Sequence, residues 1–133
     1  MPGLKGLIVD TPYIDYILSG EKTWEMRSRN CSIRGLVALI KKGTKTVVGV
    51  VNIVDAIGPL ANDQLRSNTD KHRLTVNQLD DPRIAKWNNA WVLEHARKLP
   101  NPIPYKHPSG AVIWVSLDAE TSKQIRRVIS SIS

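Results

Sequence analysis

The stretch Leu18-Ser-Gly-Glu-Lys-Thr-Trp-Glu-Met-Arg27 joins the predicted end of a helix to the predicted start of a strand. Gly20 suits the left-handed turn that ends many helices. Side chains along a strand alternate between its faces, so Glu25 and Arg27 project together, opposite the apolar residues of the same strand. Lys22 stands at the strand entrance. Half-buried charges need partners, so the pattern predicts a cluster of opposite charges at a polar cavity. The alternative is an exposed ion pair of little energetic value.

The residues before this stretch predict a strand followed by a helix. Residues 6–10 form a short apolar run, typical of a buried strand. Thr11 is a suitable N-cap for the helix, and Pro12 suits its first position. Apolar residues then recur at helical spacing and should face the core, namely Ile14, Ile17 and Leu18.

The rest of the chain is rich in short strands separated by Gly and Pro. Further strands are predicted at residues 36–40, 46–57, 90–99 and 111–117, with a bulge at Gly49. Short helical segments are predicted at residues 61–66 and 81–87. Residues 100–108 are predicted to be an irregular loop, because proline lacks the backbone N–H that a strand uses. Asp118 should cap a C-terminal helix over about residues 119–132.

These elements predict an α+β fold: a small β-barrel of about six strands with an early helix and a C-terminal helix. The length of 133 residues suits one domain. Residues 1–133 are therefore assigned to a single domain, with its core over about residues 4–118. The sequence predicts no oligomeric state.

The composition points to an anionic partner. Lys and Arg number 19 against 12 Asp and Glu, which gives a formal net charge of +7. Such a surplus suits a polyanion, most often nucleic acid, and an indifferent basic surface is the alternative. Cys31 is the only cysteine, expected to be an apolar filler, and this usage favours a reducing, cytoplasmic compartment. The sequence shows neither a signal-peptide pattern nor an apolar run of about 18 residues, so no membrane partner is expected.

Common catalytic signatures are absent from the sequence. There is no phosphate-binding P-loop, no His-Glu-x-x-His, no Gly-x-Ser-x-Gly and no zinc-deaminase pattern. His72, His95 and His107 are scattered singly, without the spacing of metal ligands. Neither a metal nor a cofactor is therefore expected.

The opening stretch resembles the signature of the ASCH domain, the activating signal cointegrator homology domain. That motif is roughly Gly-x-Lys-x-x-x-x-Arg after a helix, often with an acidic residue two positions before the Arg. Gly20, Lys22, Glu25 and Arg27 stand at those places. The flanks are similar too, at residues 34–35, 91–94, 100–108 and 110–114, so the resemblance covers about residues 4–118.

This resemblance implies a barrel of the PUA-like superfamily, whose members mostly bind RNA or modified nucleic acid. The motif is implied to line the ligand cleft. Some relatives are hydrolases: small bacterial ones remove the acyl group of N4-acetylcytidine, and another is a ribonuclease. The amidohydrolase members use a Lys and a Thr of the motif and a distant Glu. Lys22 matches that Lys, Glu25 stands in place of that Thr, and residues 69–78, where the distant Glu should lie, contain none.

Two functional hypotheses use the same cleft. In the first, the protein binds RNA or DNA, or a nucleoside-type small molecule, and Lys22, Glu25 and Arg27 read a nucleotide or modified base that stacks on Trp91 or Tyr105. Phosphate contacts are predicted for Arg29, Arg34, Lys71, Arg73 and Lys106. In the second, the protein is a hydrolase in which Glu25 is the general base and Lys22 polarises the scissile group. A weaker third hypothesis makes the C-terminal helix a protein-docking surface.

Overall fold

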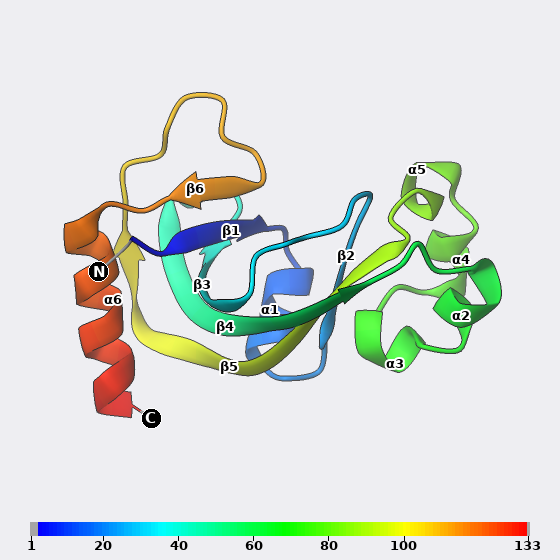
Figure 1. Ribbon diagram of the computed structural model, residues 1–133, viewed down its shortest axis with the longest axis horizontal. Helices are drawn as coiled ribbons and strands as arrows, with labels where there is room; N and C mark the ends of the chain where they lie inside the picture. The colour runs from blue at the N-terminus through cyan, green and yellow to red at the C-terminus, as the bar shows by residue number, and fades with distance from the viewer. Residues whose placement is uncertain (1–2, 133) are drawn as a thin grey trace.

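The computed structural model describes residues 3–132, and Figure 1 shows the arrangement of their elements. In chain order the elements are β1 (Lys5–Val9), α1 (Tyr13–Leu18), β2 (Trp24–Arg27), β3 (Gly35–Lys41), β4 (Thr46–Ile57), α2 (Asn62–Arg66), α3 (Thr69–His72), α4 (Val76–Leu79), α5 (Pro82–Ala85), β5 (Asn89–Pro104), β6 (Trp114–Ser116) and α6 (Ala119–Ile132). The assignment of residues 1–133 to one domain includes positions 1, 2 and 133, which lie outside the described residues.

Six strands form one strongly curled sheet in the order β2-β5-β4-β3-β1-β6. Among the strands of residues 3–132, β1 and β3 run parallel, and the other neighbouring strands are antiparallel. The long strands β4 and β5 arc across the molecule together and give the sheet its half-barrel shape (Figure 1). The predicted α+β fold with a small six-stranded barrel, an early helix and a C-terminal helix is therefore confirmed.

Helices close the curled sheet at different places. Helix α1 packs with β1, β3, β4 and β5 in one buried cluster, in which Ile14 and Ile17 are fully buried. Helix α6 contributes Ile125 and Ile129 to a second cluster. The short helices α2 to α5 gather at the end of the sheet opposite α6 and enclose a third cluster that includes Met26 (Figure 1).

The predicted bulge at Gly49 is present, and it allows α1 to approach the sheet. The pairing of β4 with β3 and with β5 shifts register there. A Cβ atom on Gly49 would overlap the side chain of Leu18 and lie 2.7 Å from the carbonyl oxygen of Arg97. Only glycine therefore fits at the point where the end of α1 crosses the curved strands.

The start of α1 differs from the prediction. The helix begins at Tyr13, with Pro12 at the N-cap position, and the side chain of Thr11 makes no capping bond. Instead, the backbone N–H of Ile14 donates to the carbonyl oxygen of Asp10 over 3.0 Å. The carboxylate of Asp10 accepts the Thr11 N–H. The expectation that Thr11 caps this helix was therefore wrong. The carbonyl oxygen of Asp10 already accepts the N–H of Ile14, which is a donor that a Thr11 cap would have accepted.

The proline-rich segment also differs, because β5 continues through Pro104. Ile103 pairs with Val47 of β4, and the N–H of Tyr105 donates to Lys45. The N–H of Tyr105 faces β4, so alternation places the ring nitrogen of Pro104 toward the other edge. Pro100 and Pro102 lie where the pairing with β4 shifts register between Lys98 and Ile103, so they need not donate to the ladder there. Strand β2 pairs only with residues 89–92, so that edge of β5 needs no donor at the prolines. The predicted loop over residues 100–108 was therefore wrong for residues 100–104, whereas residues 105–108 are irregular as predicted.

Smaller differences concern the start of the last strand and the number of short helices between β4 and β5. Strand β6 begins at Trp114 instead of residue 111, although the carbonyl of Ile113 already accepts from Ile8. Helices α3 and α4 lie in a part of the chain for which only α2 was predicted. Helix α4 has a reciprocal capping box between Thr75 and Gln78. No helix of the described residues is long and apolar enough to cross a membrane.

Candidate functional site

Three charged residues of the opening stretch meet inside the fold. After α1, Gly20 takes a left-handed conformation with φ +85°, and the N–H of Lys22 returns to the carbonyl of Tyr16. Strand β2 then pairs with β5, which fixes the direction of Glu25 and Arg27. Lys22 and Glu25 are only 2% and 6% exposed, which is unusual for charged side chains. The turn and the strand together place Lys22 and Glu25 in the interior, next to Arg27.

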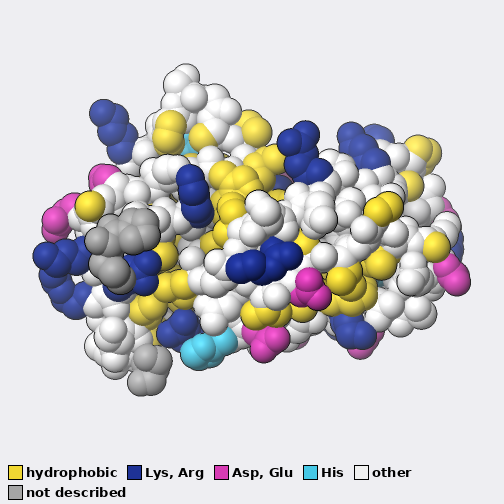
Figure 2. Space-filling view, viewed as in Figure 1, with side chains coloured by type: hydrophobic (Ala, Val, Ile, Leu, Met, Phe, Trp, Pro, Cys, Tyr) yellow, Lys and Arg dark blue, Asp and Glu magenta, His cyan; other side chains and the backbone are white. Residues whose placement is uncertain are grey.

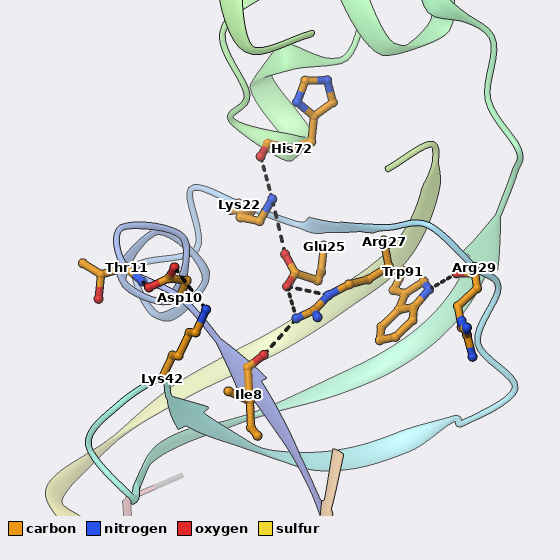
Figure 3. A network of polar contacts seen from close by, with 10 residues as sticks. All are labelled: Ile8, Asp10, Thr11, Lys22, Glu25, Arg27, Arg29, Lys42, His72 and Trp91. Atoms are coloured by element: carbon orange, nitrogen blue, oxygen red, sulfur yellow. Dashed lines mark hydrogen bonds and ion pairs between the residues drawn. The ribbon is translucent and has the colours of Figure 1, made fainter. Parts of the chain in front are cut away.

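A chain of polar contacts connects these residues (Figure 3). Arg27 donates to Oε2 of Glu25 from Nη2 over 2.7 Å and from Nε over 3.2 Å, and Nη2 also donates to the Ile8 carbonyl. Lys22 Nζ donates to the His72 carbonyl over 2.6 Å and lies 3.7 Å from Oε1 of Glu25. Both Arg27 bonds fall on Oε2, so Oε1 is the carboxylate oxygen with the greater acceptor capacity left.

Burial shapes the electrostatics of Lys22. Removal from water disfavours the ammonium and lowers the pKa of Lys22 to about 8, with Glu25 opposing the shift and Arg27 adding to it. The ammonium lies 5.3 Å from the centre of the Tyr13 ring, a further contact favourable to the charged form. Lys22 is therefore a cation whose charge changes just above neutral pH.

His72 holds Lys22 from the side of the short helices. Its ring is fully buried: Nδ1 accepts the Leu74 N–H over 2.9 Å, and Nε2 bonds the Leu65 carbonyl. Because the carbonyl can only accept, Nε2 carries the proton and the imidazole is neutral. Burial lowers the pKa of His72, which maintains this state. His72 fixes α2, α3 and the following turn, and thereby the backbone carbonyl that receives Lys22.

The charge cluster forms part of a pocket of about 290 Å³. Its apolar walls come from elements distant in the sequence: Ile8, Tyr13, Met26, Leu74, Trp87, Val112 and Ile113. The pocket also includes Asp10, Ser28 and Lys42. Sequence reasoning missed Tyr13 and Trp87 as pocket residues. Tyr13 stands four residues before Ile17 and so shares its helical face, which is a signal in the sequence. Trp87 ends the predicted helical segment at residues 81–87, and that short segment does not indicate which way its side chain faces.

Trp91 lies behind the pocket and supports Arg27. Its side chain is 2% exposed, and the Arg27 guanidinium lies 5.6 Å from the ring centre. The ring of Trp114 stacks on Trp91 with the ring centres 5.8 Å apart, and the indole N–H of Trp91 donates to the Arg29 carbonyl. Trp91 is thus packed against the charge cluster without lining the pocket.

Tyr105 lines a second pocket, of about 240 Å³, and is not among the residues of the first. Burial raises the pKa of Tyr105, so its hydroxyl stays protonated at neutral pH. Its hydroxyl bonds Nδ1 of His107 over 2.8 Å. The structure therefore does not bring the two aromatic residues predicted for stacking together with the charge cluster in one pocket.

The five residues predicted to contact phosphates are all exposed, and four of them have local contacts. Arg34 donates to the carbonyl of Cys31, Lys71 lies over the Trp24 ring, and Arg73 lies over the Tyr16 ring. Arg29 contributes its carbonyl to Trp91, and Lys106 lies between two residues of the second pocket. Figure 2 shows Lys and Arg side chains spread over one face, interspersed with Asp and Glu side chains. The described residues contain no group of three potential metal ligands.

A curled six-stranded mixed sheet with helices at its ends defines a half-barrel domain of the PUA-like class. The model of the ASCH domain family matches residues 7–103, and the chain belongs to that family. The family comprises nucleic-acid-binding and hydrolase-like domains in general terms.

Solved structures agree on the fold. The chain is similar to the crystal structure of ASCH from Zymomonas mobilis, with a TM-score of 0.67 and 15% identity over 95% of both chains. A serine-to-alanine mutant of that protein matches with a TM-score of 0.67 and 15% identity, over 96% of this chain and 98% of the mutant chain. A tyrosine-to-phenylalanine mutant matches with a TM-score of 0.68 and 15% identity, over 95% of this chain and 98% of the mutant chain. No curated protein matches the sequence significantly.

Proposed function

We propose that this protein is an RNA-binding domain that holds a nucleotide or a modified base in the pocket over Lys22, Glu25 and Arg27. The observation that carries the proposal is that Lys22 and Glu25 are buried, and Arg27 half-buried, at a pocket instead of in the closed core. Buried ion pairs contribute little net stability, so the fold alone gives weak reason to keep them. A strongly desolvated charge cluster in a cleft is more typical of a ligand site.

The free bonding capacity of the cluster matches the edge of a base. Oε1 of Glu25 can accept from an exocyclic amine or a ring N–H. Lys22 Nζ carries three N–H donors, of which one is used by the His72 carbonyl, so a donor remains for a base carbonyl or a phosphate. Tyr13 and Trp87 supply aromatic wall against which a planar ring can pack.

The net charge of +7 would hold the phosphates of the same strand. We assign this role to the exposed residues Arg29, Arg34, Lys71, Arg73 and Lys106. Lys71 is well positioned for it, because its carbonyl binds the N–H of Thr23, next to Lys22. The single buried Cys31 also leads us to propose a cytoplasmic location.

A binding assay tests the proposal. Affinity for fluorescent RNA and DNA oligonucleotides is measured by anisotropy for the wild type and for Lys22→Met and Arg27→Ala. We expect each variant to bind at least tenfold more weakly, because each removes a donor in the pocket. The matched controls are Lys123→Met and Arg127→Ala on the exposed side of α6, which remove the same charges from a remote helix. Melting temperatures verify that every variant is folded, and affinity retained by both pocket variants contradicts the proposal.

The pKa of Lys22 supports a second candidate, hydrolysis in the same pocket. A lysine with a pKa of about 8 beside a carboxylate is a common arrangement in catalytic sites. With N4-acetylcytidine, Glu25 would take a proton from water as the water attacks the acetyl carbonyl, and Lys22 would stabilise the oxyanion. The C–N bond would then break as Glu25 passes this proton to the departing N4 nitrogen, which gives cytidine and acetic acid, and the acid ionises to acetate in water. Arg27 would orient Glu25 through their shared bonds.

Turnover discriminates the two candidates. The protein is incubated at high concentration with N4-acetylcytidine and, separately, with structured RNA. Release of cytidine or RNA fragments that disappears in Glu25→Gln supports the hydrolase. Intact substrates together with measurable binding support the binding domain.

A further inference from the structure

The second pocket adjoins the pocket over the charge cluster. Ile8, Lys42 and Val112 line both, so the two pockets share a boundary. The second pocket has a volume of about 240 Å³, against about 290 Å³ for the first. Pockets for drug-sized ligands span about 300–1,000 Å³, so each of these suits one small planar group. Two such compartments side by side suit a ligand with two linked units.

The second pocket has a positive lining. Lys42 and Lys45 come from the hairpin between β3 and β4, and both are exposed. No Asp or Glu is among the described residues that line this pocket, whereas Asp10 and Glu25 line the first. Lys42 stands at the shared boundary, 3.9 Å from the Asp10 carboxylate. An anionic group between the two compartments would be attracted to Lys42 and would find Lys45 on the far side.

The aromatic side of the second pocket is held in one geometry. His107 Nε2 bonds the Ala111 carbonyl over 3.0 Å, and that carbonyl can only accept, so Nε2 carries the proton. Nδ1 therefore accepts, and the Tyr105 hydroxyl donates to it over 2.8 Å. The Tyr105 oxygen keeps acceptor capacity for an amine or ring N–H. A fixed aromatic pair with a free acceptor is suited to a base.

Val112 gives the shared rim an apolar edge. It is 75% exposed, which makes it one of the most exposed large apolar side chains of the described residues. Packing of a base on either side of Val112 would remove this surface from water. A base bound in each pocket would therefore cover the exposed side chain of Val112.

We infer that the protein binds two consecutive nucleotides of a single strand, one base in each pocket, with the linking phosphate beside Lys42. The inference rests on the proposed function and adds that the ligand is a strand segment instead of a free nucleoside. The second base lies against Tyr105 and His107, and Lys45 faces the phosphate that continues the strand.

Calorimetry with short ligands tests the inference. The four ribonucleoside 5′-monophosphates are compared with the four 5′-phosphorylated homodinucleotides at one low salt concentration. We expect at least one dinucleotide to bind tenfold or more tightly than its mononucleotide. Lys45→Asn and Tyr105→Leu should reduce this advantage to less than threefold and leave the mononucleotide affinity unchanged, because both residues line only the second pocket. Asn is chosen at position 45 because it tolerates the left-handed backbone there, with φ 54°.

Lys41→Asn is the matched control, because Lys41 lies in the same hairpin and lines neither pocket. Equal loss in Lys41→Asn and Lys45→Asn would assign the advantage to general charge and overturn the second subsite. The same conclusion follows if the wild type binds both ligand lengths equally, or if Tyr105→Leu keeps the full advantage; the proposed function survives these results. Failure of the wild type to bind either ligand overturns the proposed function and this inference with it.

Discussion

At the scale of single residues, Lys22 is the most unusual group in the molecule. It is a buried cation whose pKa is lowered to about 8, chiefly by loss of solvent, and it is held by the His72 carbonyl and faces Glu25. Glu25 in turn receives both bonds from Arg27 on one oxygen. Each member is stable in the interior only because the others are present.

The lowered pKa predicts a pH-dependent contribution to stability. In the unfolded chain Lys22 has its ordinary pKa of 10.5, so the unfolded state binds this proton more tightly than the folded state. Between about pH 8 and 10.5 the free energy of unfolding of the wild type should therefore rise relative to Lys22→Met, by up to about 3 kcal/mol. Urea unfolding of both proteins across this range measures the difference. A constant difference would show that the ammonium is not desolvated.

Removal of the Glu25 charge should be costly. Glu25→Gln leaves Lys22 and Arg27 without their buried counter-ion, and breaking a buried pair in this way costs about 3–5 kcal/mol. Glu94→Gln on the exposed part of β5 is the matched control and should change stability by about 0.5 kcal/mol or less. Denaturant unfolding at pH 7 compares the two, and equal effects would contradict the burial of the cluster.

At the scale of elements, the fold consists of a curled sheet closed by α1 on one side and by α6 on another. Helix α6 presents Ile125 to the core, fully buried, and Ser122 beneath it accepts the N–H of Leu4. The carboxylate of Asp118 accepts the Thr121 N–H, as the sequence predicts for the start of this helix. The apolar stripe of α6 is thus used within the domain, which leaves little support for the hypothesis of a protein-docking helix.

A pair of matched substitutions tests this role of α6. Ile125→Ala should destabilise the protein by about 2–5 kcal/mol, since it opens a cavity in the core. Ile132→Ala alters the same residue type in the same helix, but its side chain is 40% exposed, so a change of about 0.5 kcal/mol or less is expected. Thermal unfolding of both variants gives the comparison. Similar small effects would mean that α6 is only loosely attached.

Local patterns in the sequence predicted the elements and the charge cluster, and long-range packing explains what they left out. The Gly20 turn and the alternation of β2 act within a few residues, so Glu25 and Arg27 could be paired from the sequence alone. The pocket walls at Tyr13 and Trp87 come together only after α2 to α5 fold against β2 and β5, and no local pattern records this. The continuation of β5 through Pro104 likewise depends on which edge of the strand is free.

At the scale of the whole molecule, a chain with a formal net charge of +7 has a small pocket lined by charges of both signs. We propose that the surface attracts phosphates without regard to sequence and that the pocket reads one nucleotide. The ASCH family membership and the PUA-like half-barrel are consistent with this division of roles.

The division predicts strong salt dependence of strand binding. Each phosphate contact contributes a slope of about −0.7 in log affinity against log salt for single strands, so three contacts weaken binding on the order of tenfold between 50 and 200 mM salt. A Lys71→Ala and Arg73→Ala double variant should have a shallower slope. A Lys123→Ala and Arg127→Ala double variant on α6 should keep the wild-type slope. Anisotropy titrations at several salt concentrations measure these slopes. Equal slopes for both double variants would show that Lys71 and Arg73 do not contact phosphates.

The most direct measurement is a crystal structure of the protein soaked with ribonucleotides. We expect a base in the pocket beside Tyr13 and Trp87, within hydrogen-bond distance of Oε1 of Glu25 and Nζ of Lys22. A nucleotide bound elsewhere on the basic surface, with the pocket over Lys22, Glu25 and Arg27 empty at saturating concentration, would contradict the proposed function.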